Sequence, residues 1–91
     1  MTQSPPEVDL KAELTDDVAL VTGANRGIGA EIAAELTELG ATVYAGARNT
    51  ADVTAADQHA IKLDVTDDAE IVSAVDRIAA EQGSLDILVN N

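Results

Sequence analysis

The stretch Val18–Ile32 reads VALVTGANRGIGAEI and passes from an apolar run through three glycines into a helix-forming sequence. Val18–Val21 is continuously apolar, as expected of a strand that is buried in a parallel sheet. From Ile28 onward apolar residues recur at helical spacing, with glutamates on the opposite face. This order of strand, glycine turn and helix predicts that unpaired amides at the start of the helix face an anion.

The three glycines of this turn have different physical tasks. Gly23 lets the chain leave the strand sharply, where a side chain would clash. Gly27 and Gly29 let backbone amides approach a pyrophosphate and let the new helix pack closely on the strand. The spacing is Gly-x-x-x-Gly-x-Gly, and the turn is not a P-loop because no Gly-Lys-Ser or Gly-Lys-Thr occurs. Between a predicted strand and a predicted helix, the turn favours dinucleotide binding over a merely tight connection.

The residues after the first helix continue an alternating α/β pattern. Gly40 ends the helix, and the β-branched and aromatic content of Thr42–Ala45 predicts a second strand. Residues 49–58 fit either one short helical turn or an irregular connection. Ala60–Leu63 is a weak third strand.

A second helix and a fourth strand complete the pattern. Thr66 or Asp67 caps this helix, and Gly83 ends it. Its apolar stripe consists of Ile71 or Val72, Val75, Ile78 and Ala79. Leu85–Val89, interrupted by Asp86, is the fourth strand. The order βαβ(α)βαβ predicts a parallel sheet with right-handed crossovers.

The composition limits the classes of protein to which the chain can belong. The 91 residues include 17 acidic and 5 basic ones, for a net charge of −12, so nucleic acid and anionic membranes should repel the chain. There is no cysteine and no cluster with metal-ligand spacing, which predicts no metal site. Nothing resembles a signal peptide or a membrane span, so we expect a cytoplasmic protein. Residues 1–17, which contain Pro5 and Pro6, are interpreted as an acidic leader.

The excess of acidic residues also suggests adaptation to a cytoplasm with molar salt. Salt at that concentration screens self-repulsion within a few ångström. Under this hypothesis the helix content rises with salt concentration, which circular dichroism measures directly. Full folding in dilute buffer would contradict it.

Three motifs resemble those of the short-chain dehydrogenases/reductases. They are TGANRGIG at Thr22–Gly29, Asp64-Val65 after the third strand and Asn90-Asn91 after the fourth. The resemblance covers about residues 14–91 and implies a Rossmann-type, doubly wound α/β sheet. In that family the strand order is 3-2-1-4-5-6-7, so residues 18–91 would form a partial NAD(P)-binding domain with the order 3-2-1-4 only. The fourth strand would then expose a hydrophobic edge.

The resemblance and the charges together favour NADP(H) over NAD(H). A carboxylate after the second strand would bind the adenine ribose hydroxyls and repel a 2′-phosphate. This sequence has Gly46-Ala47-Arg48 there, with no acid at the strand end. Arg26 occupies a second position where the family uses a cation for that phosphate. The alternative for each arginine is a surface ion pair with one of the many acidic residues.

The resemblance also implies roles for the other motif residues. The Asp64 carboxylate would accept a hydrogen bond from the adenine amino group while the Val65 amide donates to the ring, although Asp64 could instead cap the following helix. Asn90 would line the cleft at the end of the fourth strand, and Asn91 would be mainly structural. The residues expected to bind the cofactor are Gly23, Asn25, Arg26, Gly27, Ile28, Gly29, Arg48, Asp64, Val65 and Asn90.

No catalytic residue is predicted within the chain. The family reduces carbonyl groups with a tyrosine acid, a lysine four residues later and a serine, all located after the fourth strand. The expected function is therefore NADP(H)-dependent oxidation or reduction of a carbonyl or alcohol substrate, represented by a dinucleotide-binding half that is inactive alone. Complete members of the family are usually homo-oligomers. The alternatives are a non-catalytic dinucleotide-binding or interaction module and an adenine-binding domain of another transferase class.

Two other residues that invite a chemical role are given structural ones. Tyr44 and Arg48 imitate a Tyr-x-x-x-basic pair, but on an extended strand they lie far apart, so Tyr44 is interpreted as a sheet side chain. His59 is expected to be a solvated loop residue without a partner.

Overall fold

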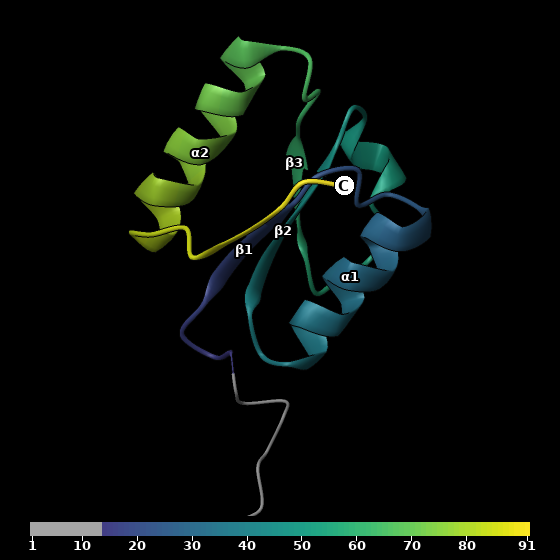
Figure 1. The fold of residues 1–91 in the computed structure, drawn as a ribbon, viewed down its shortest axis with the longest axis vertical. Helices are drawn as coiled ribbons and strands as arrows, with labels where there is room; N and C mark the ends of the chain where they lie inside the picture. Colours follow the sequence, from purple (N-terminus) through teal and green to yellow (C-terminus); the bar gives the residue numbers. More distant parts are fainter. Residues whose placement is uncertain (1–13) are drawn as a thin grey trace, which may run out of the picture.

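The computed structural model describes residues 14–91, which form a four-stranded parallel sheet with one long helix on each side (Figure 1). The elements in chain order are β1 (Val18–Val21), α1 (Gly27–Glu38), β2 (Thr42–Ala47), the 3-10 turn η2 (Thr50–Asp52), β3 (His59–Lys62), α2 (Asp68–Gln82) and β4 (Ile87–Val89). The strand order β3-β2-β1-β4 confirms the predicted Rossmann-type sheet, with β4 at one edge. Residues 1–13 of the expected leader lie outside the described residues.

Alternating side chains of the strands build two separate cores, one under each helix. On the α1 side, Ala33 packs with the small residues Ala19 and Ala45. On the α2 side, Ile78 packs with larger residues that include Leu20 and Tyr44. Because successive strand residues point to opposite faces, β1 and β2 contribute to both cores, which explains their continuous burial.

The two helices begin in different ways. The carboxylate of Asp67 accepts hydrogen bonds from the Ala69 and Glu70 amides, so Asp67 is the N-cap of α2 rather than Thr66. At its other end, α2 stops at Gly83, which has φ +85° as predicted for a helix-ending glycine. The N-cap of α1 is Arg26, whose side chain makes no capping hydrogen bond.

The strand ends differ from the predicted ones by one or two residues. β2 continues through Gly46 and Ala47 because these residues pair with β3, a non-local interaction that their small side chains do not signal. β4 begins only at Ile87. The preceding Asp86 is tied to β1 through its own backbone and side chain, which bond the O and N of Val18 at 2.9 and 2.8 Å.

The apolar stripe of α2 is only partly buried. The helix packs on the sheet through Ala74 and Ile78, which are 2% and 0% exposed. Four residues named for the predicted stripe remain exposed: Ile71, Val72, Val75 and Ala79. Within the described residues, no helix combines the length and apolar content that crossing a membrane requires.

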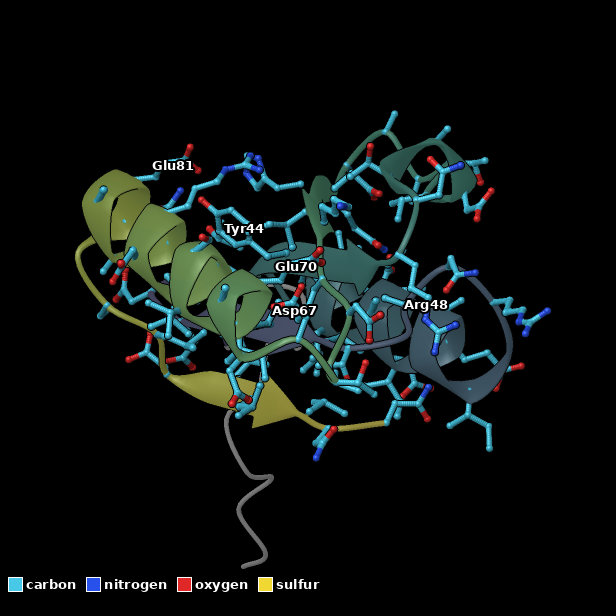
Figure 2. The ribbon with its side chains drawn as sticks, turned by 90° about the horizontal axis from the view of Figure 1, so that it is seen from above. Tyr44, Arg48, Asp67, Glu70 and Glu81 are labelled. Atoms are coloured by element: carbon cyan, nitrogen blue, oxygen red, sulfur yellow. The ribbon has the colours of Figure 1, made fainter. Side chains whose placement is uncertain are left out.

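Tyr44 anchors the end of α2 to the sheet, as Figure 2 shows from above. Its hydroxyl donates to Glu81 at 2.6 Å, and Arg77 lies over its ring at 5.7 Å. Tyr44 is therefore a sheet side chain, as predicted. His59 is exposed but not in a loop without a partner: it begins β3, and its ring stacks on Tyr44 at 4.8 Å. The parallel register places Tyr44 opposite His59, which the sequence alone does not reveal.

This anchor predicts a pH dependence of stability. Burial raises the pKa of the Tyr44 phenol, and the hydrogen bond to Glu81 raises it further. A raised pKa stabilises the fold below the ordinary phenol value, and this contribution is lost as the pH rises through the folded value. The stability difference between wild type and Tyr44→Phe should therefore shrink in strongly alkaline solution. Urea unfolding measures it, and ultraviolet titration reports the single tyrosine directly. A difference that is constant with pH would contradict the assignment.

Candidate functional site

A cleft of about 750 Å³ opens at the carboxyl ends of the central strands, where open α/β sheets bind ligands. The glycine turn after β1 forms one wall, and the segments after β2 and β3 form the other. The lining residues are Thr22, Gly23, Asn25, Arg26, Gly27, Ile28, Ala47, Arg48, Asp52, Leu63, Val65 and Asn91.

The backbone of the turn requires its glycines. Gly23 and Gly27 have φ values of +59° and +61°, which other residues rarely adopt. Gly29 is buried where α1 crosses the end of β1. A Cβ on Gly29 would lie 2.6 Å from the Asn91 side chain and would overlap the Gly23 carbonyl oxygen. The close approach of α1 to the end of β1 therefore depends on a glycine at position 29, because glycine has no Cβ.

Asn91, which follows β4, makes two hydrogen bonds to the glycine turn and holds it in place. The Asn91 amide donates to the Thr22 hydroxyl at 2.9 Å, and its side chain donates to the Gly23 carbonyl at 3.4 Å. These contacts agree with the structural role that the resemblance implies for Asn91. Asn90 accepts from the Thr22 hydroxyl at 3.4 Å.

The first turn of α1 is suited to an anion. Its amides lack a side-chain cap, and its first turn contains no acidic residue. The first turn of α2, in contrast, has the Asp67 cap and the carboxylates of Asp68 and Glu70. Free amides and the helix dipole give the start of α1 a partial positive charge at the cleft.

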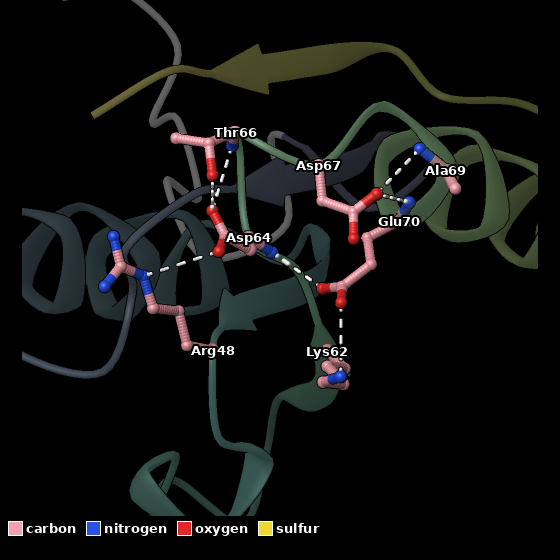
Figure 3. Close-up of polar contacts among 7 residues, drawn as sticks. All are labelled: Arg48, Lys62, Asp64, Thr66, Asp67, Ala69 and Glu70. Atoms are coloured by element: carbon pink, nitrogen blue, oxygen red, sulfur yellow. Dashed lines mark hydrogen bonds and ion pairs between the residues drawn. The ribbon is translucent and has the colours of Figure 1, made fainter.

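Two arginines add positive charge to the same cleft. Arg26 is exposed at the start of α1, and Arg48 follows β2 with its side chain 80% exposed. Arg48 Nε lies 4.0 Å from Asp64 Oδ2, at the limit of an ion pair (Figure 3). Because exposed pairs of this kind contribute little, Arg48 can turn to a stronger anionic partner. Asp52 also lines the cleft, and its carboxylate places a negative charge near the two arginines.

Asp64 forms a tight turn with Thr66 rather than the cap of α2. Its Oδ1 accepts from the Thr66 amide at 2.9 Å and from the Thr66 hydroxyl at 2.7 Å. The hydroxyl bond is the main cause that lowers the pKa of the Asp64 carboxyl. The carboxylate is therefore ionised at neutral pH and held beside the cleft, whereas Asp67 performs the capping.

Most of the residues predicted to bind the cofactor line the cleft, and three of them do not. Those on the wall are Gly23, Asn25, Arg26, Gly27, Ile28, Arg48 and Val65. Gly29 lies behind the turn, and Asp64 lies beside the cleft against Arg48. Asn90 lines a smaller pocket of about 190 Å³ near Leu88, on the α2 side.

Some lining residues were missed by the sequence analysis. Ala47 enters the wall because β2 continues beyond its predicted end at Ala45. Leu63, the last residue of the predicted third strand, follows β3 and donates its amide to the Ala47 carbonyl at 2.8 Å. Asp52 reaches it through η2, the short helical turn that was one of two interpretations of residues 49–58. Only the Asn49 side chain, which caps η2, is a local signal for this turn.

The sequence and the fold of the chain were compared with those of known proteins, and both match one family. Residues 17–91 match the family described as short chain dehydrogenase. The chain belongs to the short-chain dehydrogenase family. The 3-oxoacyl-(acyl-carrier-protein) reductase FabG of Salmonella typhimurium is 48% identical over 80 residues, covering 81% of this chain and 33% of the relative. The chain thus spans about a third of the length of the curated relatives it matches.

Solved structures from the same family share the fold. Ligand-free aldohexose dehydrogenase of Thermoplasma acidophilum superposes with a TM-score of 0.80 at 36% identity, covering 88% of this chain and 31% of that one. Hydroxysteroid dehydrogenase of Escherichia coli gives 0.82 at 30% identity, covering 93% and 39%. The names of these relatives describe chemically different substrates, so the shared region does not define a substrate.

Proposed function

We propose that the chain is the dinucleotide-binding part of an NADP(H)-dependent oxidoreductase that transfers hydride between the nicotinamide and a carbonyl or alcohol substrate. One observation carries the proposal: the uncapped start of α1 opens into a cleft that also contains Arg26 and Arg48. Free amides suit the pyrophosphate, and the two guanidinium groups suit an additional phosphate on the ribose.

The residues of the cleft divide into three binding roles. The amides around Gly27 and Gly29 would hold the pyrophosphate. Arg26 and Arg48 would bind the 2′-phosphate, for which planar guanidinium groups provide paired donors. The segment at Asp64 and Val65 would bind the adenine through a carboxylate acceptor and a backbone donor. The bound nicotinamide would supply the hydride chemistry.

The described residues do not supply the acid that such a reduction needs. The cleft lining contains no tyrosine or lysine among the residues from 14 to 91. Tyr44 lies under α2, and its hydroxyl is occupied by Glu81 (Figure 2). We therefore propose that the 91-residue chain binds the cofactor without reducing a substrate.

The proposal predicts a preference between the two cofactors. NADPH should bind the chain about ten- to hundredfold more tightly than NADH, because a charge-assisted contact to the 2′-phosphate contributes about 1.5–3 kcal/mol. Calorimetric titration of the same sample with each cofactor measures the ratio. Raising the salt concentration should reduce the preference, since phosphate contacts at exposed arginines are screened. Equal affinities, or tighter binding of NADH, would contradict NADP(H) specificity.

A further inference from the structure

The carboxylate of Glu70 connects the start of α2 with the end of β3 (Figure 3). Its Oε1 accepts a hydrogen bond from the Asp64 amide at 2.9 Å. Its Oε2 lies 3.1 Å from Lys62 Nζ. The Glu70 side chain is 23% exposed and that of Lys62 is 68% exposed. Glu70 is therefore the more buried partner of the ion pair, and Lys62 lies on its solvent side.

This contact differs from the one that a glutamate usually makes at a helix start. Asp67-x-x-Glu70 has the spacing of a capping box, in which the glutamate accepts from the N-cap amide. Here the Asp67 amide donates to the Asp64 carbonyl at 2.9 Å, and Glu70 reaches back to the Asp64 amide instead. Asp67 caps the helix with its own carboxylate. Glu70 thus stabilises the turn before the helix, whereas Asp67 caps the start of the helix itself.

The hydrogen bonds of this turn leave one amide available at the cleft. The Asp64 and Thr66 amides, on either side of Val65, are held at 2.9 Å by Glu70 Oε1 and by Asp64 Oδ1. Within the described chain, no acceptor binds the Val65 amide, and Val65 lines the cleft. The turn therefore presents one carboxylate acceptor and one backbone donor in a fixed order.

We propose that Glu70 is a positioning residue for recognition of the adenine base. By holding the Asp64 amide, it fixes the orientation of the backbone that carries both the Asp64 carboxylate and the Val65 donor. The inference rests on the proposed function, because it assumes that this turn meets the base. Adenine offers an amino donor and a ring-nitrogen acceptor, which complement these two groups. Hypoxanthine presents a carbonyl and a ring N–H at the same positions and matches neither.

Two substitutions of Glu70 separate its acceptor from its charge. Glu70→Gln keeps an oxygen that can accept from the Asp64 amide but loses the charge that faces Lys62. Glu70→Met has a similar length and no acceptor. Asp76→Ala is the matched control, since it removes one negative charge from an exposed position of the same helix.

The first readout needs no ligand. Hydrogen exchange of the Asp64 amide, followed by NMR, should accelerate about fivefold in Glu70→Met, because one hydrogen bond contributes about 1 kcal/mol. Glu70→Gln and Asp76→Ala should exchange like the wild type. An unchanged Asp64 amide in Glu70→Met would overturn the proposal.

The second readout is discrimination between bases, measured by calorimetry with NADPH and with its analogue that carries hypoxanthine in place of adenine. The wild type should prefer NADPH about ten- to hundredfold, and Glu70→Met should lose at least about tenfold of this preference. Glu70→Gln and Asp76→Ala should retain it. Equal weakening of both ligands in Glu70→Met would indicate a structural role only and would overturn the proposal.

The same titrations distinguish failure of this inference from failure of the proposed function. A wild type that binds neither dinucleotide overturns the proposed function and this inference with it. A wild type that discriminates the bases while Glu70→Met discriminates equally well overturns only the role of Glu70. If Glu70→Met does not fold, Glu70→Asp, whose shorter side chain does not reach the Asp64 amide, is judged by the same two readouts.

Discussion

Replacing Gly29 with alanine is expected to weaken NADPH binding about hundredfold, because at least two charge-assisted contacts to the pyrophosphate would be misplaced. The added Cβ would overlap the Gly23 carbonyl oxygen and lie 2.6 Å from the Asn91 side chain. Both groups belong to the wall of the cleft, and the carbonyl is rigid backbone. The turn must therefore shift, which also costs about 1–3 kcal/mol of stability, as overpacking does elsewhere. Calorimetry and urea unfolding measure the two effects.

Gly83→Ala is the matched control for this substitution. Gly83 has φ +85° at the end of α2, and a Cβ there would meet no atom within 4 Å. The strained backbone should cost about 1–2 kcal/mol of stability. Since the residue does not line the cleft, the affinity for NADPH should remain that of the wild type. A Gly29→Ala variant that binds NADPH as tightly as Gly83→Ala would contradict the role given to the turn.

Replacing Arg48 with alanine is expected to weaken NADPH binding about ten- to hundredfold and NADH binding hardly at all. The guanidinium group is exposed at the cleft, and among residues 14–91 its ion-pair partner is the Asp64 carboxylate at 4.0 Å, the limit of such a contact. A 2′-phosphate carries more charge and more acceptors, so it should outcompete that partner. Parallel titrations of the variant with both cofactors measure the selectivity.

Arg77→Ala controls for the loss of a positive charge. Arg77 lies on α2 and pairs with Glu81 at 3.1 Å, outside the cleft lining. Its removal should change neither cofactor's affinity beyond about twofold, because its charge is distant and screened. Equal losses of NADPH and NADH affinity in Arg48→Ala would show that Arg48 supports the site without recognising the 2′-phosphate.

The sequence predicts the features of the fold that depend on local chemistry. The apolar run Val18–Val21, the glycines of the turn and the cap at Asp67 each act on neighbouring backbone, so their effects can be read from adjacent residues. The resemblance to the family then supplies the strand order, which local patterns do not contain.

The remaining features depend on which strands become neighbours. Ala47 extends β2 only because it pairs with Lys62, and His59 gains a partner only because the same register places it opposite Tyr44. The contact of Glu70 with the Asp64 amide likewise requires α2 to turn back over the end of β3. These are properties of the assembled sheet, and no window of sequence contains them.

The central claim is that the amides of the glycine turn hold a dinucleotide pyrophosphate while Arg26 and Arg48 bind the phosphate on the adenine ribose. A crystal structure of the chain with excess NADP⁺ tests it most directly. We predict density for the pyrophosphate at the start of α1 and for the 2′-phosphate within hydrogen-bond distance of Arg48. An empty cleft, or an adenosine bound elsewhere on the molecule, would contradict the claim.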